Sequence, residues 1–241
     1  MSRIGVALPE ENAESFDYSG RETLGDMTLS HKYNNYLVWE IQEHYSNLDT
    51  VLDFGAGNGH FLKLLQSKPA KFLALEPDRK LQTEIKAESV AEVIEQDQLL
   101  PKSVNFIFTL NVLEHIEDDQ GILELFYNWL HEGGMLLVYV PAIPHLYSKF
   151  DASIGHFRRY HKSELKQKLM SAGFETLDIR FIDPLGYFLA LAYKLFFNTG
   201  QVKSTQIEFF DRFIFPASRV LSFFTKSFFG KNLIAVAIKR S

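Results

Sequence analysis

A short apolar run followed by a glycine loop carries the residues with the clearest chemical meaning. The run at residues 51–54 contains Asp53, and the loop has glycine at every second position, at Gly55, Gly57 and Gly59. Glycine lets a backbone turn tightly and approach a ligand without a Cβ in the way. Because an amphipathic stretch follows, the pattern predicts a nucleotide-binding corner made of a strand, a glycine loop and a helix.

The glycine spacing and Asp53 indicate which kind of ligand fits this corner. The dinucleotide fingerprint is Gly-x-Gly-x-x-Gly, and this loop departs from it because Gly59 comes one position early. A carboxylate two residues before Gly55 would also repel a pyrophosphate in a low-dielectric pocket. A nicotinamide-dependent oxidoreductase is therefore disfavoured, and a cationic ligand is favoured.

Polar side chains follow the next predicted strands, where open α/β sheets bind ligands. Glu76 ends the second strand, Asp97 ends the third, and the segment Asn-Val-Leu-Glu-His-Ile at residues 111–116 follows the fourth. Together with the glycine loop, these segments resemble the class I S-adenosylmethionine-dependent methyltransferases. S-adenosylmethionine carries an ammonium and a sulfonium group and has no phosphate, which suits a loop preceded by a carboxylate.

The resemblance extends over residues 33–182 and the last strand, and it implies a cofactor site. Residues 53–59 would wrap the methionine portion, with Asp53 near the ammonium, and Glu76 would take the ribose hydroxyls. Asp97 or Gln98 would read the adenine amino group, and residues 111–116 would lie beneath the sulfonium and the adenine. The implied cofactor-binding residues are Asp53, Gly55, Ala56, Gly57, Gly59, Glu76, Pro77, Asp97, Gln98, Asn111 and Val112.

The loop at residues 151–161 is the candidate for the acceptor side, because it follows the strand that closes the cofactor pocket. Its Gly-His-Phe-Arg-Arg-Tyr run resembles a bacterial subgroup of these enzymes that is often associated with glycan and cell-surface polymer synthesis, which is an analogy. A histidine can take a proton from an attacking hydroxyl, and paired arginines offer forked donors to carboxylate or phosphate. Alternatively, one arginine pairs within the fold and Tyr160 only packs. The candidates are His156, His115 and Tyr160 for catalysis, and Arg158, Arg159 and Tyr36 for acceptor binding.

The elements that must position these residues alternate between strand and helix. Continuous apolar strands predict a parallel sheet buried on both faces, so we expect a Rossmann-like α/β fold of seven strands with the last one antiparallel. The predicted strands are 51–54, 72–75, 92–95, 104–110, 135–140, 174–182 and 233–238, and the predicted helices are 21–45, 60–67, 79–87, 118–130 and 162–172. We expect residues 1–45 to form an arm and a helix, 46–183 the cofactor-binding core, 184–232 a helical insertion, and 233–241 the last strand of the core.

The insertion is rich in phenylalanine and is basic. It holds six basic and two acidic residues (net +4), whereas residues 1–183 hold 17 basic and 28 acidic residues (net −11). The spacing of Arg212, Arg219 and Lys226 would place the cations on one helical stripe, although Pro216 can kink or divide that helix. Three interpretations stay open: contact with an anionic membrane surface, a lid over an apolar acceptor, or cover for a sheet edge or a dimer interface.

Composition limits the function classes. The chain lacks cysteine, which excludes disulfide scaffolds and cysteine-ligated zinc, and no cluster predicts a metal. A net charge of −5 argues against nucleic acid bound through a broad basic face. No signal peptide or membrane-spanning stretch is predicted, so we expect a cytoplasmic protein, or one peripheral at the inner membrane face.

The function expected is a methyltransferase that converts S-adenosylmethionine to S-adenosylhomocysteine. The acceptor atom expected is an oxygen, rather than nitrogen or carbon, of a small or lipid-linked sugar-like molecule. The alternatives are methylation of a quinone or another isoprenoid ring, and a non-catalytic cofactor-binding protein.

Overall fold

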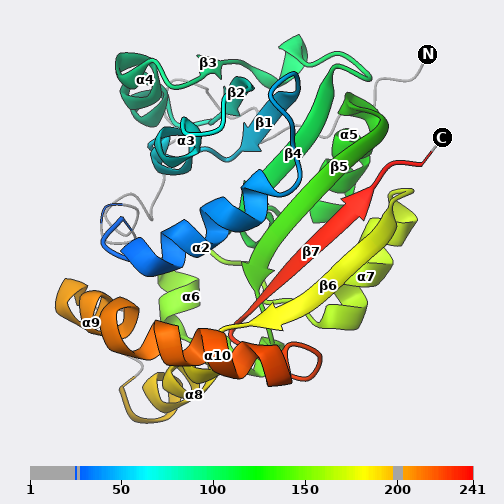
Figure 1. Cartoon of the computed structure of the whole chain (residues 1–241). Helices are drawn as coiled ribbons and strands as arrows, with labels where there is room; N and C mark the ends of the chain where they lie inside the picture. The colour runs from blue at the N-terminus through cyan, green and yellow to red at the C-terminus, as the bar shows by residue number, and fades with distance from the viewer. Residues whose placement is uncertain (1–24, 26–27, 198–202, 241) are drawn as a thin grey trace.

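The computed structural model of this 241-residue chain describes residues 25, 28–197 and 203–240. The predicted arm at residues 1–20 and the start of the predicted helix at 21–45 lie outside the described residues. The described part is built around one seven-stranded sheet of order β3-β2-β1-β4-β5-β7-β6, which confirms the α/β prediction (Figure 1). The strands are β1 Thr50–Phe54, β2 Lys71–Leu75, β3 Glu92–Val93, β4 Val104–Leu110, β5 Leu130–Pro141, β6 Glu175–Ile182 and β7 Asn232–Ile238.

The last strand runs against its neighbours, as predicted. β7 pairs antiparallel with both β5 and β6, whereas the pairs from β3 to β5 are all parallel. The carboxyl ends of β1, β2, β4 and β5 therefore lie along one edge of the sheet. Parallel sheets bind ligands at this edge, so the residues that follow these strands come together there.

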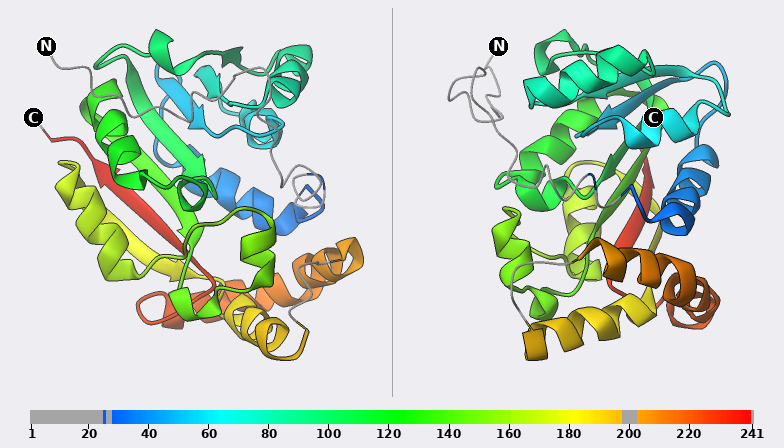
Figure 2. Two further views of the ribbon diagram at one scale, coloured as in Figure 1. Left: turned by 180° about the vertical axis from the view of Figure 1, so that it is seen from behind. Right: turned by 90° about the vertical axis from the view of Figure 1, so that its left-hand side faces the viewer.

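Helices cover both faces of the sheet (Figures 1 and 2). Side chains from α2 (His31–Gln42), α3 (His60–Leu65) and α4 (Arg79–Glu88) share a buried cluster with Val51, Phe106 and Phe108. Side chains from α5 (Asp119–Trp129) and α7 (Lys162–Ser171) pack instead with Leu52 and Ile107. Neighbouring strand residues thus enter opposite layers, because successive side chains of a strand point to opposite faces.

The segment before the fifth strand differs from the prediction. The fifth strand is predicted at residues 135–140, but β5 begins at Leu130, and its pairing with β4 jumps from Leu130 opposite Val104 to Met135 opposite Phe106. The four residues between them form an irregular bulge. Glycine is needed there because a Cβ on Gly134 would lie 2.8 Å from the His131 carbonyl oxygen.

The segment at residues 141–161, which includes the predicted loop at 151–161, contains short helical elements. A 3₁₀ turn, η3 (Pro144–Leu146), is followed by α6 (Lys149–Ser153). The side chain of Asp151 accepts hydrogen bonds from the Ser148 backbone and hydroxyl groups, so this carboxylate caps the amino end of α6. The loop is thereby given a fixed shape.

The insertion consists of helices interrupted by π-helical turns. It comprises α8 (Pro184–Ala192), η4 (Tyr193–Phe197), α9 (Ser204–Phe209), η5 (Phe210–Ile214) and α10 (Phe215–Thr225). Pro216 is the second residue of α10, directly after the π-helical turn η5. Among the described residues, no helix is long and apolar enough to cross a membrane.

Candidate active site

The glycine loop between β1 and α3 approaches both the next strand and the segment after β4. The N–H groups of Gly55 and Ala56 donate to the Leu75 carbonyl, which ties the loop to the end of β2. Gly55 has φ +78°, and a Cβ there would lie 2.4 Å from a methyl carbon of Val112. Only glycine fits this position, because a side chain would clash and would be held in a left-handed conformation.

Glu76 is fixed at the end of β2 by the backbone of the same corner. Its Oε2 accepts from the Gly57 N–H at 2.8 Å, and its Oε1 accepts from the Asp78 N–H at 2.9 Å. Each carboxylate oxygen keeps a second lone pair for another donor. Burial raises the pKa of Glu76 to about 7, although the Asp78 and Gly57 N–H groups oppose this shift.

Asp53 lies buried in β1, directly before the loop, and is 4% exposed. Burial raises the pKa of its carboxyl group, and the nearby Glu76 carboxylate raises that pKa further. Two carboxylates that share a buried site favour a cationic ligand, because a positive charge stabilises both ionised forms. The pair therefore has the electrostatics that the sequence predicts for a cationic nucleoside ligand.

The remaining predicted cofactor residues lie at the ends of the neighbouring strands. Pro77 is half-buried between Glu76 and the α4 cap, and Asp97 and Gln98 lie exposed in a 3₁₀ turn beyond β3. Asn111 follows β4 with φ +54°, a conformation that asparagine tolerates better than most residues, and its N–H donates to Tyr139. The sheet thus brings the whole predicted cofactor set to one edge.

A second cluster joins the segment after β4 to the loop after β5. The His156 Nδ1 lies 3.0 Å from Asp151 Oδ1, and its Nε2 lies 3.8 Å from Glu114 Oε1. Arg159 donates to the same Asp151 oxygen from Nε and from a terminal nitrogen, each at 2.8 Å. His115 packs edge-on against His156, with 4.5 Å between ring centres. Residues from two distant segments thus form one buried network of charges.

Charge and burial set the protonation states in this cluster. Glu114 has no exposed surface, neither of its oxygens has a hydrogen-bond partner within the described part of the chain, and burial raises its pKa to about 8. Burial and the neighbouring His156 lower the pKa of His115 to about 4, so its ring is neutral at pH 7. Burial alone would raise the pKa of Asp151, but the hydrogen bond from His156 and the Arg159 charge outweigh it and lower that pKa.

The donor types in this cluster also match those of a metal site. Glu114, His115 and His156 can place one ligand atom each within 4.8 Å of one another. Two imidazoles and a carboxylate suit a first-row transition metal. Our prediction from the sequence was that the protein has no metal, and it stays a prediction.

Two other candidates on this loop bond to the fold itself. The Tyr160 hydroxyl donates to Asp119 at 2.7 Å, and its side chain has no exposed surface. Arg158 binds the same carboxylate at 3.0 Å and the Glu117 carbonyl, with a quarter of its side chain exposed. These contacts give Tyr160 a packing position away from solvent, while Arg158 keeps partial access to a ligand.

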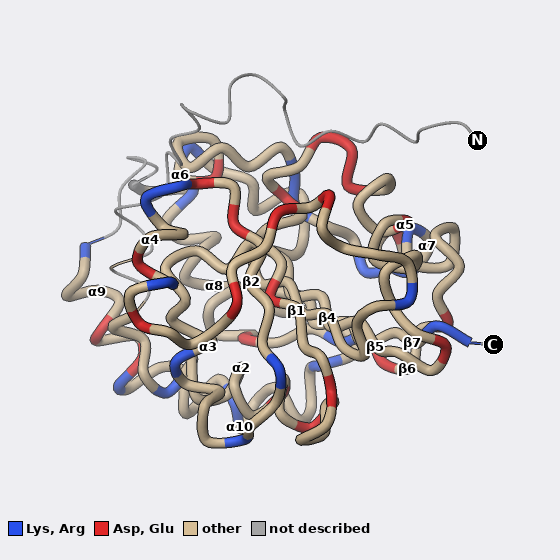
Figure 3. Tube along the Cα trace, turned by 90° about the horizontal axis from the view of Figure 1, so that it is seen from above, with Lys and Arg blue, Asp and Glu red and all other residues tan. Residues whose placement is uncertain are grey.

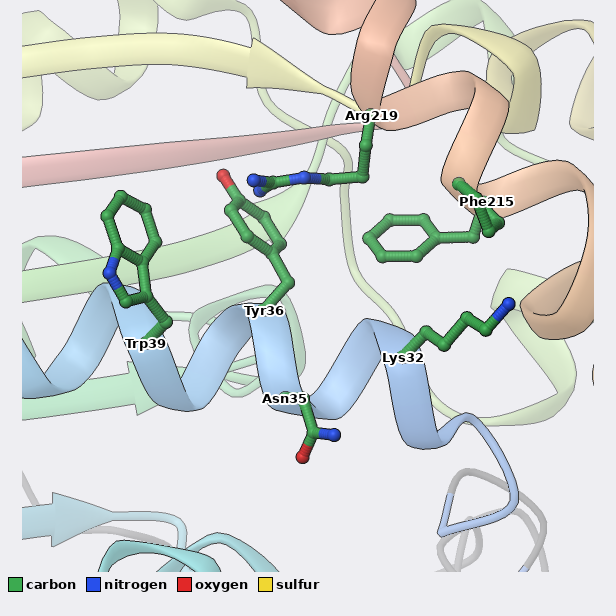
Figure 4. Close-up of a pocket in the computed structure, with 7 residues that line it drawn as sticks. Lys32, Asn35, Tyr36, Trp39, Phe215 and Arg219 are labelled. Atoms are coloured by element: carbon green, nitrogen blue, oxygen red, sulfur yellow. The ribbon is translucent and has the colours of Figure 1, made fainter.

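Tyr36 lies away from both clusters, in a hollow of about 350 Å³ between α2 and α10 (Figure 4). The Arg219 guanidinium lies 3.6 Å from the centre of the Tyr36 ring, and the side chains of Lys32 and Trp39 line the same hollow. None of the predicted cofactor residues lines it. The glycine loop, where buried carboxylates and backbone donors converge, fits the predicted cofactor better than this solvent-open hollow does.

Comparison with known proteins decides the family. A model of the methyltransferase domain family matches residues 20–179, which is more than half of the chain. The chain belongs to this methyltransferase family. No curated protein matches the sequence closely enough to be called a relative.

Solved methyltransferase structures share the fold of this methyltransferase at low sequence identity. A chain described as a methyltransferase, solved in complex with the Haloferax volcanii activator Trm112, superposes with TM-score 0.64 at 14% identity, over 93% of this chain and 95% of that one. An S-adenosylmethionine-dependent methyltransferase of Thermotoga maritima, named as a possible histamine N-methyltransferase, superposes with TM-score 0.61 at 14% sequence identity, over 92% of this chain and 98% of that one. The Burkholderia thailandensis 1,6-didemethyltoxoflavin N1-methyltransferase was solved with 1,6-didemethyltoxoflavin and S-adenosylhomocysteine bound. It superposes with TM-score 0.56 at 14% sequence identity, over 92% of this chain and 83% of that one.

The methyltransferase uses S-adenosylmethionine, and the donor set at the glycine loop fits it. Asp53 can pair with the ammonium group, because a cation would stabilise the ionised carboxylate that burial and the neighbouring Glu76 disfavour. Glu76 has one lone pair left on each oxygen, which suits the two neighbouring hydroxyls of a ribose. The glycine at position 55 lets the loop lie directly against Val112, at the floor of the site.

Asp151 is the functional residue that sequence reasoning missed. It orients His156 and neutralises Arg159, yet nothing in the motif marks it as more than one polar residue of a loop. The Ser148-x-x-Asp151 pattern is a capping signal that predicts a helix start, and it could have located this carboxylate. The sequence also does not show that Asp119 would meet Tyr160 and Arg158.

Proposed function

We propose that this methyltransferase methylates an oxygen of a small or lipid-linked, sugar-like acceptor, with His156 as the general base. The observation that most directly supports this proposal is the 3.0 Å contact between His156 Nδ1 and Asp151 Oδ1. A carboxylate on Nδ1 keeps the proton on that nitrogen and leaves Nε2 as the basic atom. A hydroxyl must lose its proton as it attacks, whereas a neutral amine attacks through its lone pair, so a fixed base favours an oxygen acceptor.

S-adenosylmethionine supplies an electrophilic methyl group on a good leaving group, so the chain's residues mainly bind and orient. Asp53 and Glu76 hold the donor in this proposal, and Asp97 or Gln98 reads the adenine amino group. Positioning of this kind can supply roughly 7–11 kcal/mol of the barrier reduction. His115, neutral at pH 7, lies beside His156 and can accept a hydrogen bond from the acceptor.

Arg158 and the insertion support an acceptor with both an anionic and an apolar part. Arg158, in the same loop as His156, keeps a quarter of its side chain exposed, and its guanidinium could pair with a phosphate or carboxylate. The insertion contacts the same loop, because His145 Nε2 lies 3.2 Å from the Tyr187 hydroxyl. A second candidate for the acceptor atom is an oxygen or carbon of a quinone or another isoprenoid ring, which the apolar insertion next to this loop favours.

The test is formation of S-adenosylhomocysteine by the full chain with a panel of acceptors: a sugar phosphate linked to a polyprenyl lipid, a quinol and a primary amine. We expect turnover with a hydroxyl acceptor and loss of that turnover in His156→Gln, with cofactor affinity unchanged by calorimetry. Turnover confined to the amine, undiminished in His156→Gln, would refute the proposal. Asp53→Ala and Glu76→Ala should abolish S-adenosylmethionine binding, and unchanged affinity in both would refute the cofactor site.

A further inference from the structure

The insertion holds most of the exposed large apolar side chains among the described residues. Ten of its large apolar side chains are between 44% and 77% exposed, against six such exposed side chains in all the other described residues. The ten are Phe188, Leu189, Leu195, Phe196, Phe209, Phe213, Val220, Phe223, Phe224 and Phe228. Monomeric proteins rarely expose a patch of more than a few hundred Å² of contiguous apolar surface, and larger patches mark interaction sites.

The spacing of these side chains places them on defined helix faces. In the first helical stretch, Phe188 and Leu195 are seven residues apart, as are Leu189 and Phe196, so the two pairs share one face. In the second stretch, the exposed positions Phe209, Phe213, Val220 and Phe223 follow one another at intervals of four, seven and three residues, and Phe224 is adjacent to Phe223. We call the ten side chains together the phenylalanine face.

The opposite side of the second stretch is fixed to the core. Asp211, Phe215 and Ser218 are buried, at the spacing of the inward face. Asp211 accepts hydrogen bonds from the Lys32 and Tyr33 N–H groups at the start of α2, and the Phe215 ring centre lies 4.4 Å from that of Tyr33. The phenylalanine face is therefore held outward by a packed inner face, and a simple lid would not need such attachment.

The charge around the phenylalanine face is positive. The segment 184–232 holds six basic and two acidic residues, and one of the acidic residues, Asp211, is buried against the start of α2. Glu208 is left as the exposed acidic group, against exposed cations at Lys203, Arg212 and Lys226. Figure 3 shows basic positions recurring around the α9 and α10 end of the molecule.

We infer that the phenylalanine face binds the surface of an anionic lipid bilayer. Exposed phenylalanines bordered by lysine and arginine are typical of helices that lie in the membrane interface, and each basic residue gains energy from anionic headgroups. A symmetric dimer through the same face is disfavoured, because it would set like charges of the two copies against each other. This inference depends only on the phenylalanine face, so it would still hold if the proposed oxygen acceptor proved wrong.

Membrane contact would place the acceptor loop close to the bilayer. Lys194 Nζ in η4 donates to the His145 carbonyl at 2.6 Å, and Tyr187 in α8 contacts the His145 ring. His145 belongs to η3, in the chain segment that leads to Asp151 and His156. A protein docked through its insertion therefore presents the loop after β5 next to the lipid headgroups, where a lipid-linked acceptor would be found.

Co-sedimentation of the full chain with vesicles tests the inference. We expect binding to vesicles of phosphatidylcholine mixed with phosphatidylglycerol, little binding to phosphatidylcholine alone, and weaker binding as salt rises. Lys226→Glu should lower the partition coefficient about five-fold or more. Phe223→Ser with Phe224→Ser should lower it about ten-fold per residue, while Leu100→Ser with Leu177→Ser, two exposed apolar residues of the core, should leave it unchanged.

Each variant is first shown to bind S-adenosylmethionine as the unaltered chain does, so that unfolding is not mistaken for lost membrane binding. A chain that stays in the supernatant with the phosphatidylglycerol vesicles overturns the inference. Equal binding by the Phe223/Phe224 variant and the Leu100/Leu177 control overturns it too. A dimer in light scattering that Phe223→Ser with Phe224→Ser converts to a monomer, without vesicle binding, identifies the face as an interface between copies.

Discussion

His156 and Asp151 are joined by a 3.0 Å contact between Nδ1 and Oδ1, which leaves His156 Nε2 directed toward Glu114. The geometry gives the histidine a defined tautomer, because the carboxylate holds the proton on Nδ1. Arg159 binds the same Asp151 oxygen and keeps that carboxylate ionised. An orienting carboxylate, a histidine and a neighbouring acid thus form a series of contacts that begins in the loop after β5 and ends in the segment after β4.

The first prediction concerns this series of contacts. His156→Gln should lower kcat by about 10²–10⁴-fold, the usual contribution of a general base, and His115→Gln should lower it less, since His115 only assists in binding. Asp151→Asn should lower kcat while shifting the pH profile, because the amide no longer selects the tautomer. Steady-state kinetics with S-adenosylmethionine affinity measured in parallel checks this, and equal kcat for His156→Gln and the unaltered chain would contradict it.

The second prediction concerns Glu114 and pH. Its pKa is raised from 4.5 to about 8 by burial, so the folded chain holds a proton that the unfolded chain releases above pH 4.5. The stability of the folded state therefore falls as pH rises from 4.5 toward 8, by at most about 1.4 kcal/mol per pH unit from this group. Denaturant unfolding should show that Glu114→Gln gains stability relative to the unaltered chain as pH rises through this window.

The control for this prediction is Glu117→Gln, an exposed glutamate three residues away. It removes a carboxylate from the surface of the same segment, so it measures what the loss of a glutamate there does to stability. Glu76, whose pKa is also raised, contributes equally to both chains and cancels in the comparison. A stability difference between Glu114→Gln and the unaltered chain that is independent of pH would show that Glu114 is ionised in the folded protein.

The third prediction is that the protein works without a metal. The Glu114, His115 and His156 donors lie close together, but Arg159 and Asp151 already provide this network with a fixed cation and a carboxylate that orients His156. Treatment with a chelator should leave the rate of S-adenosylhomocysteine formation unchanged, and elemental analysis should find no transition metal in proportion to protein. A bound metal that His156→Gln and Glu114→Gln both remove would contradict this expectation.

The sheet and the cofactor edge could be predicted because both depend on local signals. Apolar runs such as residues 104–110 mark strands buried on both faces, and a ligand edge follows from the parallel order of those strands. The glycines of the loop mark positions where φ is positive, which the structure has at Gly55, Gly57 and Gly59. These features are encoded within a few residues of where they act.

The acceptor side depends on contacts between distant residues, which the sequence does not show. Tyr160 meets Asp119 across 41 residues, and Asp211 reaches the start of α2 across 178 residues. The π-helical turns of the insertion were also not predicted, because a helical pattern of apolar residues does not distinguish one turn type from another. Partners of this kind are set by packing, which the spacing of residue types does not specify.

The fourth prediction tests how closely the glycine loop packs on Val112. Gly55→Ala adds a Cβ that would lie 2.4 Å from a Val112 methyl carbon, at φ +78°. We expect a loss of about 1–2 kcal/mol from the left-handed conformation and about 1–3 kcal/mol from overpacking, together with weaker cofactor binding. Adding Val112→Ala should restore only the packing part, measured by denaturant unfolding, and a full restoration would mean that the backbone conformation is not constrained.

The fifth prediction concerns the attachment of the insertion to the core. Ser30 precedes α2 without a side-chain cap, and Asp211 from η5 supplies one instead by accepting from the Lys32 and Tyr33 N–H groups at 3.0 and 2.9 Å. Asp211→Ala should therefore lower the free energy of unfolding by about 0.5–2 kcal/mol, the usual cost of losing a helix cap. Asp211→Asn should lose less, because its amide oxygen can still accept from one N–H.

The matched control is Glu208→Ala, which removes an exposed carboxylate one turn earlier in the same helical stretch. It should change the unfolding free energy by less than about 0.5 kcal/mol, as surface substitutions usually do. Denaturant unfolding measures both variants, and hydrogen exchange of the α2 amides locates the effect, since faster exchange at Lys32 and Tyr33 is expected only in Asp211→Ala. Equal stability of Asp211→Ala and Glu208→Ala would mean that the insertion is joined to α2 by its aromatic contacts alone, through Phe215 and Tyr33.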